Sequence, residues 1–410
     1  MTSNARRFAS ALPLVACLAL LLPVSAQAQT IAWTREFGTT RDDIALDAAA
    51  NSTDVYIAGT SNGNLADQDQ HGGGDAFLRR TSGGGAVRWT RFFSSAQFDT
   101  ANSVALAGSE VVIGGRSGAI GDAFVAAYNT AGTLLWAHEF GSPRGQDSVR
   151  SVAADDTGIY VAADVSKRVQ PLPNHGGADI VLDRYDLAGN LIWSKEIGTK
   201  GNDVQGSVAL DGAGSLYATF TTTGAIPGTT NAGFDDVVVR RYDLDGNAIW
   251  TRQYGTTNDE QEFSAVADAG GVYVGGTTRD PNGTGDTAFL DTLLLKYRPK
   301  GALAWTNQFG SVKDDYLFDL SLSGRHLFAA GETTGDLPGQ TSAGEGDAFL
   351  AEYQPDGTQD WVDQIGTTGN DIGQGVSASN GRAFLVGYTN GTFPGLINHG
   401  ATDAFVTKVA

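Results

Sequence analysis

Short runs of apolar residues, separated by turn residues, follow one another along the chain after residue 29. In DVVVRRYDLDGNAIW, at residues 236–250, a β-branched run is followed by an Asp-Gly-Asn turn and a second apolar run. This pattern predicts a β-hairpin. Two further short strands belong to the same unit, as in SVALDGAGSLYATF at residues 207–220. No stretch keeps a helical period, so the pattern predicts an all-β protein built from four-stranded units.

The unit recurs seven times. The tryptophans are 55 to 57 residues apart, with one exception of 47, at positions 33, 89, 136, 193, 250, 305 and 361. An aspartate lies 14 residues before each of the last six tryptophans: Asp75, Asp122, Asp179, Asp236, Asp291 and Asp347. Asp403 continues this series. A fixed offset at this period indicates a propeller or a solenoid. Four antiparallel strands per unit form one propeller blade.

The distribution of side-chain size and the two chain ends favour a closed ring over a solenoid. The first strand of each unit is rich in Ala, Ser, Gly and Val, which suits a crowded axis, and larger residues fall on the third strand. Residues 403–410 supply a third strand without a fourth, and residues 31–37 supply a fourth strand without a third. Pairing the two would remove both exposed edges. We therefore expect a seven-bladed β-propeller closed by its N-terminal strand.

Three segments carry a resemblance to a known repeat: DAFVAAYNTAGTLLW, DIVLDRYDLAGNLIW and DAFLAEYQPDGTQDW, which start at residues 122, 179 and 347. Such units resemble the bacterial β-propeller repeat called SBBP, over essentially all of residues 31–410. The resemblance implies export and a surface or binding role. It implies no set of catalytic residues.

Residues 1–29 have the features of a signal peptide. Arg6 and Arg7 precede an apolar stretch, and small residues up to Ala28 suit cleavage. An alternative is a lipid anchor on Cys17, which follows Leu-Val-Ala. Because the only cysteine lies in this segment, residues 30–410, expected to form one domain, can hold no disulfide or thiolate site. We expect an exported protein of the periplasm, the cell surface or the medium.

The charge and hydropathy exclude several classes of partner. Acidic residues outnumber basic ones 46 to 27, which gives a net charge of −19. This charge argues against binding to nucleic acid or to an anionic membrane surface. No stretch beyond residue 29 is apolar enough to span a bilayer, so we expect no membrane insertion of the mature chain. We also expect a monomer.

The repeated acidic residues and histidines have structural interpretations. An aspartate at the entry of a strand accepts bonds from loop amides, and we favour this interpretation over a shared metal site. Residues 243–247, DLDGN, look like the start of a calcium loop, but its twelfth position is Tyr254 instead of glutamate. His71, His175 and His399 share one repeat position, and equivalent residues of different blades are too far apart to share one zinc ion. We expect no metal site, cofactor or catalytic residue.

The repeat departs most from its pattern in the second unit, which lacks about nine residues between its second and third strands. Phe98 precedes the first strand there, and Arg116 is expected in the shortened loop. His71 and His175 are expected on either side. An aromatic ring, a cation and two imidazoles predict a ligand site for a small polar molecule or a glycan. The alternative is drift of the repeat, with Phe98 filling the space left by the deletion.

The sequence thus predicts a non-catalytic interaction or scaffold module that binds an unidentified protein or glycan. The alternative is a propeller enzyme that acts on a carbohydrate, or uses a quinone-type cofactor, at its central face. Runs of the form Gly-x-x-x-Trp, such as GNLIW at residues 189–193, are similar to those of quinoprotein propellers. Central acidic side chains with shifted pKa values would favour the enzyme, and a shallow uncharged rim would favour the module.

Overall fold

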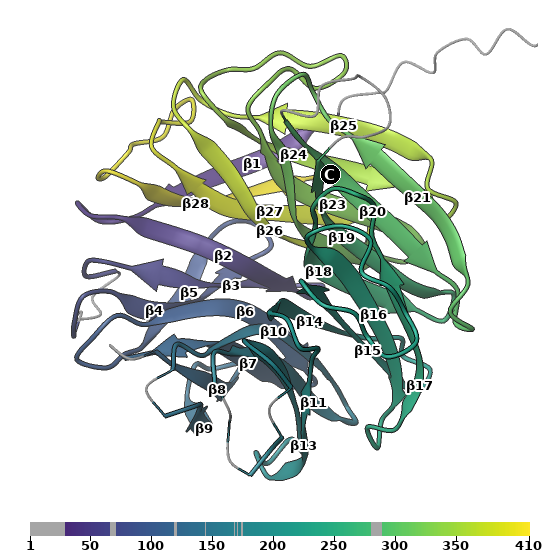
Figure 1. The fold of residues 1–410 in the computed structure, drawn as a ribbon. Helices are drawn as coiled ribbons and strands as arrows, with labels where there is room; N and C mark the ends of the chain where they lie inside the picture. Colours follow the sequence, from purple (N-terminus) through teal and green to yellow (C-terminus); the bar gives the residue numbers. More distant parts are fainter. Residues whose placement is uncertain are drawn as a thin grey trace, which may run out of the picture.

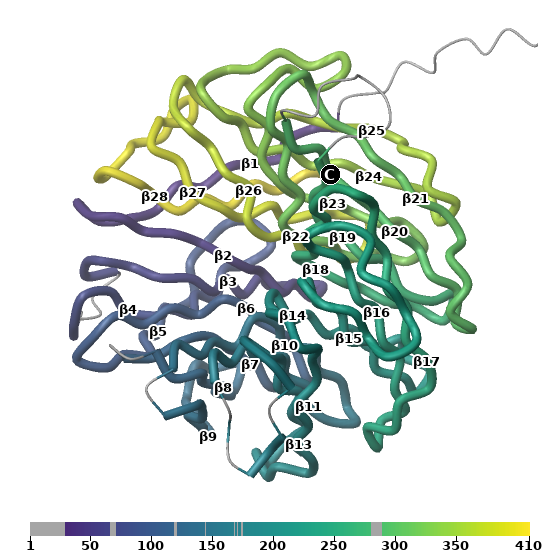
Figure 2. Tube along the Cα trace, viewed as in Figure 1, coloured from purple at the N-terminus to yellow at the C-terminus, as the bar shows by residue number. Residues whose placement is uncertain are grey.

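The protein is a ring of seven four-stranded antiparallel sheets, which confirms the seven-bladed propeller (Figure 1). The computed structural model describes residues 29–65, 71–118, 121–143, 145–167, 169, 171–173, 175–279 and 289–410. All regular structure in these residues is strand, and none of it is a helix that could cross a membrane. Residues 1–28 of the signal peptide predicted at residues 1–29 lie outside the described residues. The chain passes around the ring blade by blade, as the colour sequence in Figure 2 shows.

Each blade contributes one strand to each of four concentric positions. The innermost strands are β2 (Asp43–Ala50), β6 (Thr100–Ala107), β10 (Ser148–Asp155), β14 (Asp203–Leu210), β18 (Glu260–Asp268), β22 (Asp315–Ser323) and β26 (Asp371–Ser379). The second strands are β3 (Asp54–Ser61), β7 (Glu110–Ser117), β11 (Gly158–Val165), β15 (Ser215–Thr222), β19 (Gly271–Arg279), β23 (His326–Thr333) and β27 (Arg382–Thr389). The third strands are β4 (Asp75–Ser82), β8 (Asp122–Asn129), β12 (Asp179–Tyr185), β16 (Asp236–Asp243), β20 (Leu290–Tyr297), β24 (Asp347–Tyr353) and β28 (Asp403–Val409). The outermost strands are β5 (Val87–Phe93), β9 (Leu134–Phe140), β13 (Leu191–Ile197), β17 (Ala248–Tyr254), β21 (Leu303–Phe309), β25 (Gln359–Ile365) and β1 (Ile31–Phe37).

The N-terminal strand closes the ring, as the sequence predicts. β1 pairs antiparallel with β28, with Phe37 opposite Ala404 and Trp33 opposite Lys408. Figure 1 shows the purple β1 beside the yellow strands of the last blade. Blade 7 is therefore made from the two ends of the described chain, β26, β27 and β28 with β1. This pairing covers the edge of β28, which would otherwise be open to another chain.

The hydrophobic core lies between neighbouring blades. One cluster joins Tyr56 and Leu78 of blade 1 to Val104, Ile113 and Phe124 of blade 2, and every one of these side chains is buried. The innermost strands carry small residues, as predicted, but the large buried rings fall on the second strands as well as on the third. The wedge-shaped gap between blades is filled in this way.

The repeated tryptophans hold each blade to the next. The Trp89 indole N–H donates to the Thr130 carbonyl oxygen of blade 2 at 3.1 Å. The same bond joins four further pairs at 2.9 to 3.1 Å: Trp136 to Leu187, Trp193 to Leu244, Trp250 to Pro299 and Trp305 to Pro355. Each acceptor belongs to a turn that ends in a glycine with positive φ, such as Gly132 at 82°. A β-carbon on Gly132 would lie 3.0 Å from the Trp89 ring, so the turn needs glycine both for its conformation and for the close approach.

The repeated acidic residues organise loops. At the start of each innermost strand, a carboxylate accepts the backbone N–H of the residue four or five positions earlier, at 2.5 to 2.7 Å. The seven acceptors are Asp43, Asp99, Asp147, Asp203, Glu260, Asp315 and Asp371. In five blades the aspartate that starts the third strand accepts an equivalent bond, as Asp236 does from the Ala232 N–H at 3.0 Å. These bonds bear out the structural interpretation of the repeated acids.

Candidate functional site

One face of the ring carries the longer loops, and we call it the loop face. It is the face at which the innermost strands begin, and it also carries the connections between second and third strands. That connection spans residues 118–121 in blade 2 but 62–74 in blade 1 and 166–178 in blade 3. The connection of blade 2 is therefore shorter than those of its two neighbours on the loop face, as the sequence predicts, and we call this position the notch.

Phe98 and Arg116 meet at this notch. Phe98 is 37% exposed, and the Arg116 guanidinium carbon lies 5.6 Å from the centre of its ring. Phe98 also forms a backbone bridge with Gly74, and a β-carbon on Gly74 would lie 2.9 Å from the Phe98 ring. The expectation that Arg116 lies in the loop is wrong. It belongs to β7, opposite Thr100 of β6 and Ala123 of β8, because the pairing with β6 reaches Arg116 and the pairing with β8 continues to Ser117.

The two predicted histidines lie in different places. His71 is in the loop of blade 1 that contacts the Phe98 loop, where the Gly73 N–H donates to the Gln97 carbonyl oxygen at 3.2 Å. His175 lies in the equivalent loop of blade 3, which contacts the segment before blade 4: the Gly177 N–H donates to the Gly201 carbonyl oxygen at 2.9 Å. His175 lines a groove with Arg240 and Tyr242 of blade 4. The structure thus brings Phe98 and Arg116 together, with the loop of His71 alongside, and it places His175 in the groove between blades 3 and 4.

The innermost strands enclose a central channel, at the face where the alternative enzyme would act. Two adjoining cavities of about 390 and 330 Å³ occupy it, and both are lined by Asp47, Ser103, Ser151, Ser207, Ser264 and Asp319. The second cavity opens toward the loop face, and we call it the channel mouth. Besides the six residues that line both cavities, each blade contributes one side chain to the mouth: Leu46, Asn102, Arg150, Gln205, Phe263, Phe318 and Gln374.

Aromatic rings cover one side of the channel mouth. Phe263 and Phe318 meet edge to face with their ring centres 5.7 Å apart, and Tyr316 stacks on Phe318 at 5.8 Å. The exposed faces of such rings attract flat or apolar ligand surfaces. Both phenylalanines are partly exposed to the channel.

Blades 3 and 4, next to the aromatic side of the mouth, contribute hydrogen-bonding groups. The Arg150 Nε donates to Asp164 Oδ2 at 2.8 Å, and the backbone amide of Gln205 donates to the same oxygen at 3.1 Å. Gln205 has a φ of 60°, which is uncommon for a residue other than glycine, and the pairing of β14 with β15 skips from Val204 to Ser207 there. Bulges and strained residues at a strand end re-aim side chains and concentrate at functional sites. Asp164 thus fixes both Arg150 and Gln205 at the mouth.

Below the mouth, a ring of hydrogen bonds ties the innermost strands together. In six blades a serine or an aspartate accepts the backbone N–H of the next blade at 2.7 to 3.2 Å. The acceptors are Asp47, Ser103, Ser151, Ser207, Ser264 and Asp319. Blade 7 has Gly375 at this position, where a β-carbon would lie 2.8 Å from the Asp47 α-carbon.

The two aspartates of this ring have raised pKa values. Burial raises the pKa of Asp319 to about 6, against backbone N–H groups that lower it. Burial also raises the pKa of Asp47 well above its ordinary value, and the nearby charge of Asp319 raises it further. The signal for this pair is present in the sequence, because the fifth residue, counted from the repeated acid at the start of each innermost strand, is Asp, Ser, Ser, Ser, Ser, Asp and Gly in blade order. We missed it because only blade-to-blade geometry shows that this position faces the axis.

Comparison with known proteins gives one related sequence. The chain is 26% identical over 324 residues to the regulatory protein FlaEY of Caulobacter vibrioides, which covers 69% of this chain and 34% of that protein. The chain thus spans about a third of the length of its curated relative. No family model matches, so the resemblance to the SBBP repeat remains a prediction.

The solved structures that resemble the chain are distant. A protein of unknown function from Bacteroides caccae has a TM-score of 0.44 at 12% identity, over 82% of this chain and 97% of that one. The Pan2 WD40 domain of Neurospora crassa has a TM-score of 0.44 at 11% identity, over 76% and 89%. The acylaminoacyl peptidase of Pyrococcus horikoshii has a TM-score of 0.46 at 9% identity, over 85% and 51%.

Proposed function

We propose that the chain is a non-catalytic binding module that holds its ligand at the channel mouth. One observation carries this proposal: the mouth is a cavity of about 330 Å³ to which every blade presents one side chain, of five residue types in all. Cavities of this size, with aromatic walls and a few fixed polar groups, are typical of ligand sites. The name of the Caulobacter relative, a regulatory protein, agrees with a binding role.

The chemistry of the mouth favours a glycan among the expected ligands. Phe263 and Phe318 offer ring faces to the apolar face of a sugar, and the amides of Asn102, Gln205 and Gln374 can bond its hydroxyl groups. A single sugar residue fits the cavity volume, and the rest of a chain would lie on the loop face. A peptide segment is the other outcome that the test below distinguishes.

The test is a screen of residues 30–410 on glycan and peptide arrays, followed by affinity measurements on variants. Phe318→Ala should weaken binding about tenfold, equivalent to about 1.4 kcal/mol. The matched control is the notch variant Phe98→Ala with Arg116→Ala, which should bind normally. Normal binding by Phe318→Ala and loss in the folded notch variant would place the site at blade 2 instead.

A propeller enzyme is the second candidate, and the raised pKa values of Asp47 and Asp319 favour it. A carboxyl group with a pKa near 6 can serve as a general acid. Against this role, both carboxylates already accept backbone N–H groups of the following blade. Incubation of a bound glycan with the protein, followed by mass spectrometry, separates the two functions. Cleavage by the wild type that is lost in Asp319→Asn would contradict a non-catalytic module.

We also propose that the protein is exported by cleavage within residues 1–29. Cell fractionation and mass spectrometry of the mature N-terminus test this proposal. An unmodified chain that begins near residue 29 is expected. A lipid-modified N-terminus at Cys17 would favour the membrane anchor, and retention of residues 1–29 in the cytoplasm would contradict export.

A further inference from the structure

The contact between blades 6 and 7 is built differently from the contacts between the other blades. In those, cationic side chains of the third strand donate to a turn of the next blade. Arg80 donates to the Thr130 carbonyl oxygen at 2.5 Å, and Arg241 donates to the Pro299 carbonyl oxygen at 2.6 Å. Blade 7 has no turn at this place, because its third and fourth strands come from opposite ends of the chain. The side chains of blade 6 therefore need other partners.

The position two residues after the tryptophan shows the same change. In four blades its side chain donates to a glycine carbonyl oxygen of the next blade, at 2.7 to 2.9 Å. The donors are Arg91, His138, Arg252 and Asn307. Blade 6 has Asp363 at this position, which is an acceptor instead of a donor.

Three repeat positions of blade 6 are acidic where blade 1 has arginine. They are Glu352, nine residues before the tryptophan, Asp360, one residue before it, and Asp363, two residues after it. The corresponding residues of blade 1 are Arg80, Arg88 and Arg91. Arginine suits the carbonyl oxygen of a turn, whereas a carboxylate suits a donor or a positive charge. The change therefore indicates that blade 6 faces a positively charged group.

Two of these carboxylates have partners within their own blade. Glu352 accepts the Trp361 indole N–H and lies 2.7 Å from the His326 Nδ1. Asp360 accepts the side-chain amide of Gln354 and lies 3.7 Å from the same Nδ1. Asp363 is thus the carboxylate that can serve the neighbouring blade.

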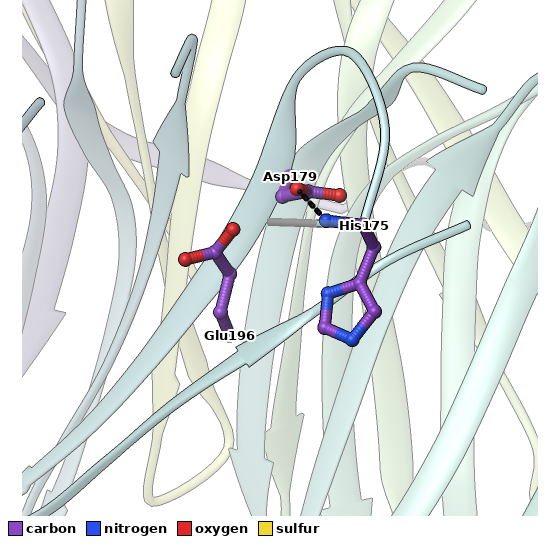
Figure 3. Close-up of side chains that lie close together, drawn as sticks. All are labelled: His175, Asp179 and Glu196. Atoms are coloured by element: carbon purple, nitrogen blue, oxygen red, sulfur yellow. Dashed lines mark hydrogen bonds between the residues drawn. The ribbon is translucent and has the colours of Figure 1, made fainter. Parts of the chain in front are cut away.

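Asp363 differs from the repeated acids in where its partner lies. Figure 3 shows a repeated acid of blade 3, where Asp179 accepts the His175 backbone N–H of its own blade at 2.9 Å, with Glu196 on the adjacent strand. The Asp363 Oδ2 instead accepts the Gln29 backbone N–H at 3.0 Å. Gln29 lies just before β1, the strand that closes the ring. This bond therefore joins blade 6 to blade 7.

The surroundings of Asp363 favour a charged partner over a neutral one. Asp363 is only 7% exposed, and burial raises the pKa of its carboxyl group, whereas the Gln29 N–H lowers it. An ammonium group at the place of this N–H would stabilise the carboxylate more, because hydrogen bonds between charged groups are about twice as strong as neutral ones. A cavity of about 160 Å³ adjoins Gln29, with room for water at the other N–H groups of an ammonium.

Cleavage of the predicted signal peptide would create this ammonium group. The small residues that suit cleavage end at Ala26 and at Ala28. Hydrolysis after Ala28 adds one water to the peptide bond, which leaves a carboxylate on Ala28 and an α-ammonium group on Gln29. Hydrolysis after Ala26 would place the charge on Gln27, two residues before the nitrogen that contacts Asp363.

We propose that the chain is cleaved between Ala28 and Gln29, and that the new α-ammonium group forms an ion pair with Asp363. The inference rests on the export proposed above and names the bond that is cut. The ion pair exists only in the mature chain, so removal of the signal peptide strengthens the contact between blades 6 and 7 at the strand that closes the ring.

The test compares two purified chains, which begin at Gln29 and at Gln27 and are released from fusion proteins by a protease. The α-amine of the shorter chain should have a pKa about one unit above the ordinary value of about 8, because Asp363 stabilises its charged form. The longer chain should keep the ordinary value. Carbon-13 NMR of the reductively methylated amines measures both. Intact-mass measurement excludes chains whose first glutamine has cyclised, since cyclisation removes the charge.

The melting temperature gives a second readout. At pH 7 the shorter chain should melt about 2 °C above the longer one. Asp363→Asn should abolish this difference, because asparagine still accepts a hydrogen bond but carries no charge. Asp360→Asn, on the same strand, is the matched control and should preserve the difference.

Three outcomes would overturn parts of the proposal separately. An ordinary α-amine pKa in the folded shorter chain, or a difference in melting temperature that persists in Asp363→Asn, would refute the ion pair. An exported protein that begins at Gln27 would refute the cleavage point. Retention of residues 1–28 would refute export and the cleavage with it, whereas the ion pair is measured on purified chains independently of export.

Discussion

The tryptophans near the rim and the side chains of the channel mouth are both sets of seven repeat positions, and they differ in one respect. The rim positions are tryptophan in every blade, whereas the mouth presents Leu, Asn, Arg, Gln, Phe, Phe and Gln in blade order. A residue that every blade needs for packing is the same in every blade. The positions of the mouth are not fixed by packing in this way, so their residues can differ from blade to blade. We expect these differences to select the ligand.

Two of the seven tryptophans, Trp33 and Trp361, do not make this bond in the described part of the chain, and topology explains Trp361. Trp361 has no turn of the next blade to contact, because the third and fourth strands of blade 7 come from opposite ends of the chain. Its indole N–H donates to Glu352 of its own blade instead. A break in the rim therefore marks the ring closure, whereas the variation at the mouth has no such cause.

Removal of the closing strand should have the largest effect. Deletion of residues 30–38 removes β1, exposes the edge of β28 and leaves blade 7 with three strands. We expect loss of soluble monomer, measured by size-exclusion chromatography of the purified fraction. A monomeric deletion variant with the wild-type melting temperature would show that the ring does not depend on this closure.

Substitution at the rim should cost more than substitution at the mouth. Trp250→Ala removes a packed indole and its bond to Pro299, and we expect the free energy of unfolding to fall by about 3–4 kcal/mol. Phe318→Ala removes a partly exposed ring that contacts the neighbouring blade through Phe263, and we expect a smaller loss of about 1 kcal/mol or less. Urea denaturation measures both values.

The comparison would be reversed if Phe318→Ala destabilised the protein as much as Trp250→Ala. In that case the mouth would be part of the structural core, and its variation could not be assigned to ligand selection. The Trp250→Phe variant serves as a milder control, since it retains an aromatic ring and loses only the hydrogen bond.

Stability should also depend on pH through Asp319. Its pKa is about 6 in the folded protein and 3.8 when unperturbed, so the folded state binds the proton more tightly than the unfolded state. The contribution of protonated Asp319 to the free energy of unfolding is therefore complete below about pH 4, and it is lost as the pH rises through about 6. Asp319→Asn cannot ionise, so its melting temperature should change less than that of the wild type between pH 4 and pH 7. Parallel melting curves would contradict the raised pKa.

The sequence predicted the fold because its structural residues repeat. The constant offset between tryptophan and aspartate predicted the blades, and the unpaired end segments predicted the pairing of β1 with β28. The channel mouth could not be predicted in this way, because its side chains are of five different residue types and become neighbours only around the axis. Arg116 was misplaced because the end of β7 is set by pairing, which the sequence does not show.

The smallest expected effect concerns the ring of hydrogen bonds below the mouth. Ser103→Ala leaves the Val152 N–H without its acceptor, and we expect a loss of about 1 kcal/mol. Ser207→Ala should cost a similar amount at the Ala265 N–H. Because the two bonds join different pairs of blades and share no partner, the double variant should lose the sum of the two values within about 0.5 kcal/mol. Urea denaturation measures these values. A larger loss in the double variant would mean that the hydrogen bonds of this ring stabilise one another cooperatively. The repetition of serine in the ring would then have a structural cause, like the repetition of tryptophan at the rim.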